Sequence, residues 1–218
     1  MTPLFALALL PALTCAPERL PGIDVSAYQG AIDWRRVHAA GVVFAFARVS
    51  DGLDADSRFA ANFAAMRRAH IKRGAYQYFR ASEDADAQAD LAIRAIRHAG
   101  AADIPLVADV ETDDGETREV LHAKLRRWLA RVEKRTHRRP LIYTSPSLGA
   151  ILDGNFGDWP LWVAHYDVDC PALPDGWTSW TFWQHSQTGR IDGITGDVDL
   201  DHFAGTKKDL RRLNRRSR

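Results

Sequence analysis

Two carboxylates one residue apart, Asp109 and Glu111, close the apolar run at residues 104–108. The side chains of an extended run alternate between its two faces, so these two leave the same face with backbone positions about 6–7 Å apart. Two carboxyl groups this close oppose each other's ionisation, so that one holds a proton while the other stays charged. An acid beside an anion is the pair that cleavage of a glycosidic bond requires. The spacing predicts this reaction and leaves its stereochemistry, retaining or inverting, open.

The rest of the chain must fold so as to present these carboxylates, and it alternates apolar, strand-like runs with helical segments. In the segment 116–137, apolar residues such as Leu121, Leu125 and Trp128 recur at helical spacing, which is typical of a helix packed on a sheet. The expected strands are 22–28, 42–49, 74–79, 104–111, 140–144, 161–166, 181–186 and 197–203. The expected helices are 33–40, 56–70, 83–99 and 116–137.

Eight strands with helices mainly in the first half predict a compact variant of the (β/α)8 barrel. A doubly wound sheet is the rival fold, but it does not readily explain three late strands without crossover helices. In a barrel the chemistry lies at the carboxyl ends of the strands, so we expect one site there. Polar side chains recur at or near the ends of all eight runs: Asp24, Ser50, Asp51, Gln77, Tyr78, Asp109, Glu111, Tyr143, His165, Tyr166, Gln184 and Asp199.

Several of these residues belong to short motifs that occur in a fixed order along residues 22–205. The motifs are GIDVSAYQG at 22–30, IDW at 32–34, GAYQYF at 74–79, DVE at 109–111, PLWVAHY at 160–166, FWQ at 182–184 and VDLD at 198–201. In these segments the chain resembles glycoside hydrolase family 25, the lysozymes that cleave peptidoglycan between N-acetylmuramic acid and N-acetylglucosamine. The resemblance implies a single α/β domain with a flattened, TIM-like (β/α)5(β)3 barrel.

The resemblance also implies a role for each site residue. Glu111 is the general acid, and Asp109 is its charged partner, which stabilises positive charge at the anomeric carbon or orients the substrate's own 2-acetamido group. That acetamido neighbour favours retention by substrate assistance. Asp24 and Asp199 complete an acidic floor. The residues expected to bind the sugars are Tyr78, Tyr143, Trp162, Tyr166, Trp183 and Gln184.

The chain departs from the family pattern at three places. Gln77 stands where His is frequent, and Asp201 stands where Asn is frequent. Residues 48–52 follow the usual Lys-x-Thr/Ser-x-Gly pattern only loosely. We expect these departures to bear on substrate fine structure and level of activity rather than on the type of reaction.

At 218 residues, with 46% hydrophobic and 26% charged residues, the chain is long enough for one well-buried domain. We expect an export leader and short linker at 1–21, the catalytic barrel at 22–205 and a basic tail at 206–218. From residue 207 on, the tail has seven basic residues and one acid, a charge of +6, so the rest of a chain with net charge +1 carries −5. Such a tail could contact anionic envelope polymers. We expect peptidoglycan glycan strands as the partner, no nucleic acid, and a monomer.

The first fifteen residues resemble an export signal, because residues 4–10 form an unbroken apolar run that is too short to span a bilayer. We therefore expect an exported protein, whether secreted, periplasmic or envelope-associated. The chain has two cysteines, Cys15 and Cys170. They could form a disulfide, and Cys15 could instead carry a lipid; the sequence leaves both open.

Other chemistries fit the residues less well. Four acids at a barrel mouth could hold a divalent metal, but such sites generally add His or further oxygen ligands, and only His165 stands at a strand end. Chitinase-like barrels carry a longer acidic repeat, where this chain has Val107. No Gly-x-Ser-x-Gly turn surrounds Ser145 or Ser147, which argues against a serine hydrolase. We expect no metal and no cofactor; a glycan-binding barrel that has lost catalysis is the alternative function.

Overall fold

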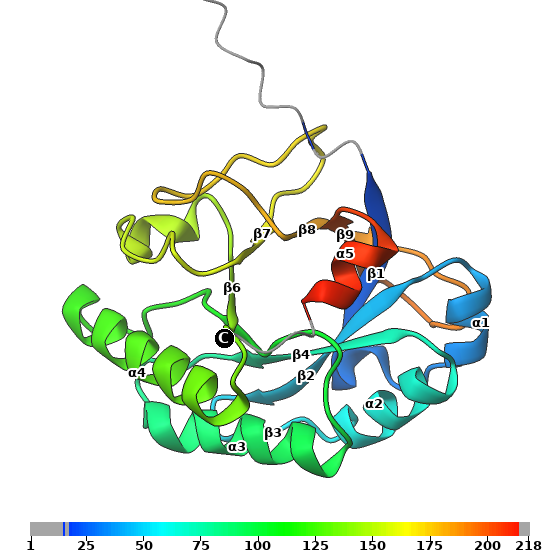
Figure 1. Cartoon of the computed structure of the whole chain (residues 1–218), viewed down its shortest axis with the longest axis horizontal. Helices are drawn as coiled ribbons and strands as arrows, with labels where there is room; N and C mark the ends of the chain where they lie inside the picture. Colours follow the sequence, from blue (N-terminus) through cyan, green and yellow to red (C-terminus); the bar gives the residue numbers. More distant parts are fainter. Residues whose placement is uncertain (1–14, 16–17, 214–218) are drawn as a thin grey trace, which may run out of the picture.

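The computed structural model describes Cys15 and residues 18–213 (Figure 1). Eight of its strands close into a barrel in the order β1, β2, β4, β5, β6, β7, β8, β9 and back to β1, while the short β3 pairs only with β2. The strands are β1 (Arg19–Val25), β2 (Phe44–Asp51), β3 (Asp54–Ala55), β4 (Lys72–Tyr78), β5 (Val107–Asp109), β6 (Leu141–Thr144), β7 (Leu161–Ala164), β8 (Phe182–Gly189) and β9 (Val198–Ala204). The expected barrel is confirmed.

The barrel strands run parallel except β9, which is antiparallel to both β8 and β1. Only residues 190–197 join β8 to β9, which is too short for a helical crossover, so the chain returns as a hairpin. Because β9 is reversed, its first residues lie at the same end of the barrel as the last residues of the other strands. In the register of β1 and β9, Asp24 lies opposite Asp199.

Helices follow each of the first five barrel strands, and the last of these is a short 3-10 helix. The helices are η1 (Ala27–Gln29), α1 (Trp34–Ala39), α2 (Phe59–Arg68), α3 (Ala85–His98), α4 (Arg118–Thr136), η2 (Leu148–Leu152) and α5 (Lys207–Arg212). The connection from β7 to β8, near the top of Figure 1, has no helix. This arrangement matches the expected (β/α)5(β)3 pattern.

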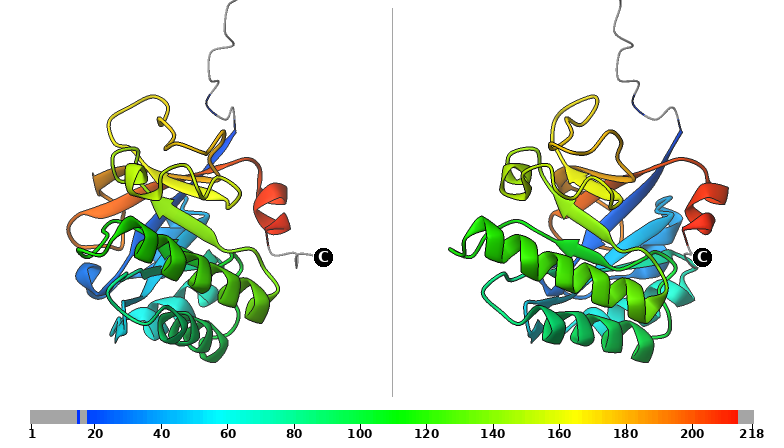
Figure 2. Two further views of the ribbon diagram at one scale, coloured as in Figure 1. Left: turned by 90° about the vertical axis from the view of Figure 1, so that its left-hand side faces the viewer. Right: turned by 60° about the vertical axis from the view of Figure 1, so that its left-hand side comes forward.

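Local sequence explains where α4 begins and which face it buries. The Thr117 side chain caps its start by accepting a hydrogen bond from the Val120 N–H. The stripe that includes Leu121, Leu125 and Trp128 is fully buried against the sheet, as the helical spacing predicted. Helix α4 lies beside α3, as Figure 2 shows, and ion pairs join the two helices.

Aromatic side chains fill the interior of the barrel and form an apolar layer below the site. Phe46 stacks on Trp162 with ring centroids 4.3 Å apart, and Phe182 meets Phe46 edge-on at 5.0 Å. Glycine makes room for these rings, because a Cβ at Gly74 would lie 2.1 Å from the Phe46 ring. A second apolar layer lies between the sheet and the helices, so the barrel is packed on both of its faces.

Most element boundaries differ from those expected by one to three residues, and the differences at β5 and β1 bear on the site and on the domain limits. Strand β5 spans only Val107–Asp109, so Glu111 lies just past the strand end rather than within it. Strand β1 begins at Arg19, inside the segment expected to be linker, and ends at Val25, after which η1 begins. The basic tail starts as the short helix α5, whose Leu210 is buried against the barrel.

A disulfide joins Cys15 to Cys170, with Cα atoms 5.5 Å apart and a sequence separation of 155 residues. It fastens the segment before β1 to the loop between β7 and β8. Of the two outcomes that the sequence left open, the structure shows the disulfide. A sulfur in a disulfide cannot also carry a thioether-linked lipid, so lipid attachment at Cys15 is contradicted. Of the leader and linker expected at 1–21, residues 1–14 and 16–17 lie outside the described residues. Within the described part of the chain, no helix is long and apolar enough to cross a membrane.

Candidate active site

A cavity of about 280 Å³ lies at the carboxyl ends of the barrel strands, where the site was expected. We call it the catalytic cavity. Nine of the ten predicted site residues line it: Asp24, Tyr78, Asp109, Glu111, Tyr143, Trp162, Tyr166, Gln184 and Asp199. They come from β1, β4, β5, β6, β7, β8 and β9 or from the residues that follow these strands, so the barrel gathers side chains that are far apart in the sequence.

The tenth predicted residue, Trp183, lies outside this cavity. Neighbouring residues of a strand face opposite sides, and on β8 it is Gln184 that points into the barrel. The Trp183 ring packs in the outer layer against Trp180, and its Nε1–H donates to the His165 carbonyl at 2.7 Å. The prediction of Trp183 as a wall of the sugar groove is therefore wrong.

Several lining residues were not predicted. Tyr28 stands at the rim with 84% of its surface exposed, and the Arg48 guanidinium lies 5.0 Å from the centre of its ring. Tyr76 lies deeper in the cavity. Two signals pointed to them: Tyr28 belongs to the motif at 22–30, and Tyr76 is two residues from Tyr78 on the same strand. The other unpredicted lining residues are Val25, Ser26, Gln29 and Gln187.

The carboxyl groups of Asp109 and Glu111 are in hydrogen-bonding contact, so the pair can share one proton. Asp109 is buried, with 5% of its surface exposed, whereas Glu111 is half-buried. Burial raises the pKa of Asp109 well above its usual range, and the charge of Glu111 raises it further. Burial also raises the pKa of Glu111, while the contact with Asp109 and the charge of Arg80 act in the opposite direction.

The pKa values of both carboxyl groups are raised, so the buried pair favours a single shared proton over two charges. The protonated Glu111 beside an ionised Asp109 that the sequence predicts stays a prediction. The two carboxyl groups differ in depth, since Asp109 ends a buried strand and Glu111 is half-buried. Each is influenced by the charge of an arginine, Arg48 for Asp109 and Arg80 for Glu111.

Two further acids face this pair across the cavity. Burial and the charge of Asp199 raise the pKa of Asp24 well above its usual range. Burial raises the pKa of Asp199 to about 6. Gln184 fixes the Asp24 side chain by donating from Nε2 to Asp24 Oδ2 at 2.7 Å. The orientation of the Gln184 amide is itself fixed, because Oε1 accepts from the hydroxyls of Tyr143 at 2.8 Å and Tyr166 at 2.7 Å.

Asp201 lies behind the acidic floor and was not predicted as a site residue. It is buried, with 1% of its surface exposed, and its Oδ1 accepts from Trp162 Nε1–H at 2.8 Å. Burial and the charge of Asp24 raise its pKa well above the usual range, so a neutral carboxylic acid is favoured. Its position two residues beyond Asp199 on β9 was the available signal.

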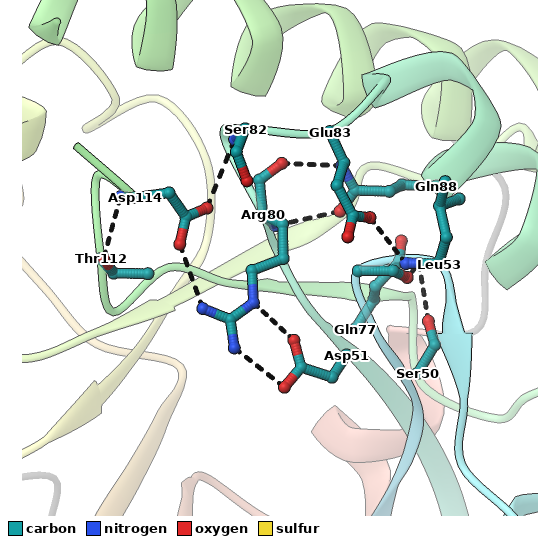
Figure 3. A network of polar contacts seen from close by, with 11 residues as sticks. Ser50, Asp51, Leu53, Gln77, Arg80, Ser82, Glu83, Gln88, Thr112 and Asp114 are labelled. Carbon is teal, nitrogen blue, oxygen red and sulfur yellow. Dashed lines mark hydrogen bonds and ion pairs between the residues drawn. The ribbon is translucent and has the colours of Figure 1, made fainter. Parts of the chain in front are cut away.

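Arg80 holds the segment that carries Glu111 against the ends of β2 and β4. As Figure 3 shows, Arg80 donates to both oxygens of Asp51, at 2.6 and 2.9 Å, and to Asp114 at 3.0 Å. Its guanidinium also lies 4.4 Å from the centre of the Tyr78 ring. Asp114 follows Glu111 by three residues, so this network places the Glu111 backbone relative to the barrel.

The departure at Gln77 does not reach the cavity. Gln77 is fully buried on the outer face of β4, where its Nε2 donates to Ser50 Oγ at 2.8 Å and its Oε1 accepts from Trp128 Nε1–H at 2.7 Å. It joins α4 to the barrel, and its role is structural. Among the described residues, no group of three or more His, Cys, Asp or Glu is placed to hold a metal ion.

Comparison with known proteins agrees with this geometry. The model of the family described as "Glycosyl hydrolases family 25" matches residues 23–194. The chain belongs to this family. Membership in family 25 makes it a glycoside hydrolase.

Relatives and solved structures of the family cover most of the chain. YegX, an uncharacterised protein of Escherichia coli O6:H1, is 39% identical over 206 residues, which are 89% of this chain and 73% of YegX. Lysozyme M1 of Streptomyces globisporus is 37% identical over 201 residues, 85% of this chain and 68% of the lysozyme. The crystal structure of a bacterial lysozyme from Streptomyces coelicolor superposes with a TM-score of 0.81 at 33% identity, covering 89% of this chain and 96% of that one.

Proposed function

We propose that the protein is a lysozyme that hydrolyses the β-1,4 bond between N-acetylmuramic acid and N-acetylglucosamine in peptidoglycan, with Glu111 as the general acid. Membership in family 25 and the similarity to lysozymes and to an N,O-diacetylmuramidase support muramidase activity. The observation that carries the assignment of residues is the contact between Asp109 and Glu111 in a cavity lined by aromatic side chains.

Because the two carboxyl groups can share one proton, bound substrate can determine which of them holds it. The N–H of the substrate's acetamido group can donate a hydrogen bond to Asp109, which favours the ionised form of that carboxyl group. The proton then passes to Glu111, whose side chain reaches the cavity nearer to solvent. Glu111 gives it to the leaving oxygen, while ionised Asp109 orients the acetamido group for attack on the anomeric carbon. In this scheme a bound glycan favours the arrangement in which Glu111 holds the proton.

Analysis of the released fragments tests the proposed bond. Purified peptidoglycan is digested, and the reducing ends of the products are identified by mass spectrometry. We expect reducing muramic acid, because the bond that breaks joins its anomeric carbon to the next sugar. Reducing glucosamine ends would assign the enzyme to a different hydrolase class, and binding without any release of fragments would favour a glycan-binding barrel.

We also propose that the enzyme acts outside the cytoplasm as a monomer. The disulfide between Cys15 and Cys170 is typical of proteins that fold in oxidising compartments. Within the described part of the chain, the large hydrophobic residues that are exposed are Tyr28, at the rim of the cavity, and Leu53. Neither forms the extended apolar patch that stable self-association needs.

The basic tail forms a positive surface at the end of the barrel that lies away from the catalytic cavity. We propose that anionic envelope polymers contact the protein at this surface. Lys207 and Arg211 of α5 line a hollow with His38, His70 and Lys72, next to the first residues of β2 and β4. The acidic cavity lies at the other end of the strands. Contact through the tail therefore leaves the catalytic cavity free to take a glycan strand.

A further inference from the structure

A second cavity, of about 380 Å³, adjoins the catalytic cavity, and Glu111 lines both. Tyr143 and Tyr166 also line both and form the wall between them. The other lining residues of the second cavity come from the segment after β6 and from the end of β7: Ser145, Pro146, Ser147, Leu148, Ala164 and His165. Asp24, Asp109 and Asp199 line the catalytic cavity alone.

The roles of Glu111 and Asp109 indicate which of the two sugars occupies each cavity. This step rests on the proposed function. A general acid must face the oxygen between the two sugars, so Glu111 belongs at the boundary between their sites. The group that stabilises the anomeric carbon must face the sugar whose bond breaks at that carbon. Asp109 lines only the catalytic cavity. The muramic acid therefore occupies the catalytic cavity, and the departing sugar occupies the second one.

We propose that the second cavity binds the departing N-acetylglucosamine and that His165 and Ser147 are the residues that recognise it. His165 Nδ1 accepts the Ala172 backbone N–H at 3.0 Å, so the neutral ring carries its proton on Nε2. No residue in the described part of the chain forms a hydrogen bond with Nε2. His165 thus offers a donor, oriented by the protein, to a hydroxyl or acetamido oxygen of the sugar.

Ser147 offers the sugar a hydroxyl beside the His165 donor. The Ser145 hydroxyl and carbonyl are instead occupied by hydrogen bonds within the protein. Ser145 Oγ accepts the Leu148 N–H at 3.2 Å, and its carbonyl accepts the Gly149 N–H at 2.7 Å. Ser147 is exposed, and its hydroxyl lies 3.0 Å from that of Ser145. A hydroxyl held in this way can both donate to and accept from the hydroxyls of a sugar, while Leu148 offers an apolar surface to the pyranose ring.

Two single variants remove the recognition and leave the supporting contacts. In His165→Asn the amide oxygen of the new side chain lies near the former position of Nδ1. It can still accept the hydrogen bond from the Ala172 N–H, while the donor at Nε2 is removed. Ser147→Ala removes one exposed hydroxyl and leaves Ser145 in place. His98→Asn, on the exposed end of α3, is the matched control.

Each variant is assayed on two substrates that share the same donor sugars. One is a soluble glycan oligosaccharide, from which N-acetylglucosamine departs. The other is an aryl β-glycoside with 4-nitrophenol as the leaving group, which needs little protonation and offers no sugar hydroxyls. We expect kcat/KM on the glycan to fall by about three- to tenfold in each variant, the effect of one lost hydrogen bond. On the aryl glycoside it should stay within about twofold of the parent enzyme.

Equal losses on both substrates would place the two residues on the donor side and overturn the inference. Unchanged kcat/KM on the glycan would overturn it as well, because no contact with the departing sugar would then exist. Cleavage of the glycan but not of the aryl glycoside by the parent enzyme would show that hydrolysis requires a sugar on the leaving side, and the loss on the glycan relative to His98→Asn would then decide the inference. Failure on both substrates would instead refute the proposed function itself.

Discussion

Substitution of Gln184 should lower both the stability of the protein and its activity, by amounts that follow from its hydrogen bonds. Its side chain is buried, with 4% of the residue exposed, and makes three hydrogen bonds of 2.7–2.8 Å to Asp24, Tyr143 and Tyr166. In Gln184→Met the shape is kept and all three bonds are lost. Two neutral bonds at about 1 kcal/mol each and one bond to a carboxyl group at about 2 kcal/mol give about 4 kcal/mol.

Part of this loss is recovered, because Tyr166 is only half-buried and can bond to water. We therefore expect the free energy of unfolding to fall by about 3 kcal/mol, which for a chain of this size lowers Tm by about 6–12 °C. Hydrolysis of peptidoglycan should fall at least tenfold, because Asp24 is no longer held in place.

Thermal unfolding followed by circular dichroism, together with a peptidoglycan turbidity assay, measures both effects. Gln187→Met is the matched control, since Gln187 is an exposed residue of the same strand that also lines the cavity. A change in Tm of less than about 2 °C for Gln184→Met would refute the reasoning, because three buried hydrogen bonds cannot be lost at so small a cost. A loss of activity without any loss of stability would show that Gln184 acts only as a contact for substrate.

Three further predictions concern the disulfide, a half-buried histidine and the tail. Cys170→Ser should lower Tm, since closing a loop of 155 residues stabilises by up to about 5 kcal/mol, and reductant should lower the Tm of the parent enzyme but not of the variant. Burial lowers the pKa of His202 from 6.5 to about 4, so the unfolded chain binds its proton more readily and stability falls as the pH drops from 6.5 towards 4. In His202→Gln the fall in Tm over that range should be shallower, and an identical pH dependence would contradict this. The double variant Lys207→Glu, Arg211→Glu should lose salt-sensitive binding to a phosphate-rich wall polymer that Arg94→Glu retains; equal binding by both would exclude the tail as the contact.

The barrel could be predicted because its signals are local. Helical spacing fixed α4, and the polar residues at strand ends located the cavity before any contact was known. The direction of β9 has no such local signal. It depends on the short connection from β8, which has no room for a helical crossover. That reversal brings Asp199 opposite Asp24, so the acidic floor follows from tertiary pairing rather than from the motif itself.

The errors at the site also have physical reasons. Trp183 and Gln184 were both predicted to face the sugar, although adjacent residues of a strand point to opposite sides, and the alternation should have separated them. The same alternation places Tyr76 on the same face of β4 as Tyr78, and Asp201 on the same face of β9 as Asp199, so it would have predicted both additional residues. The loss of solvation at Asp109 and Glu111 could not be derived in this way, because it depends on how deeply each carboxyl group lies in the folded protein.

The central claim is that Glu111, paired with Asp109, supplies the proton that breaks the glycosidic bond. It is tested most directly by the rate of peptidoglycan hydrolysis by Glu111→Gln, compared with Glu133→Gln on the outer side of α4, both with Tm measured. We predict that Glu111→Gln keeps the Tm of the parent enzyme and loses hydrolysis by more than a thousandfold, roughly the contribution of general acid catalysis, while Glu133→Gln keeps both. A folded Glu111→Gln variant that clears peptidoglycan at the parental rate would contradict the account.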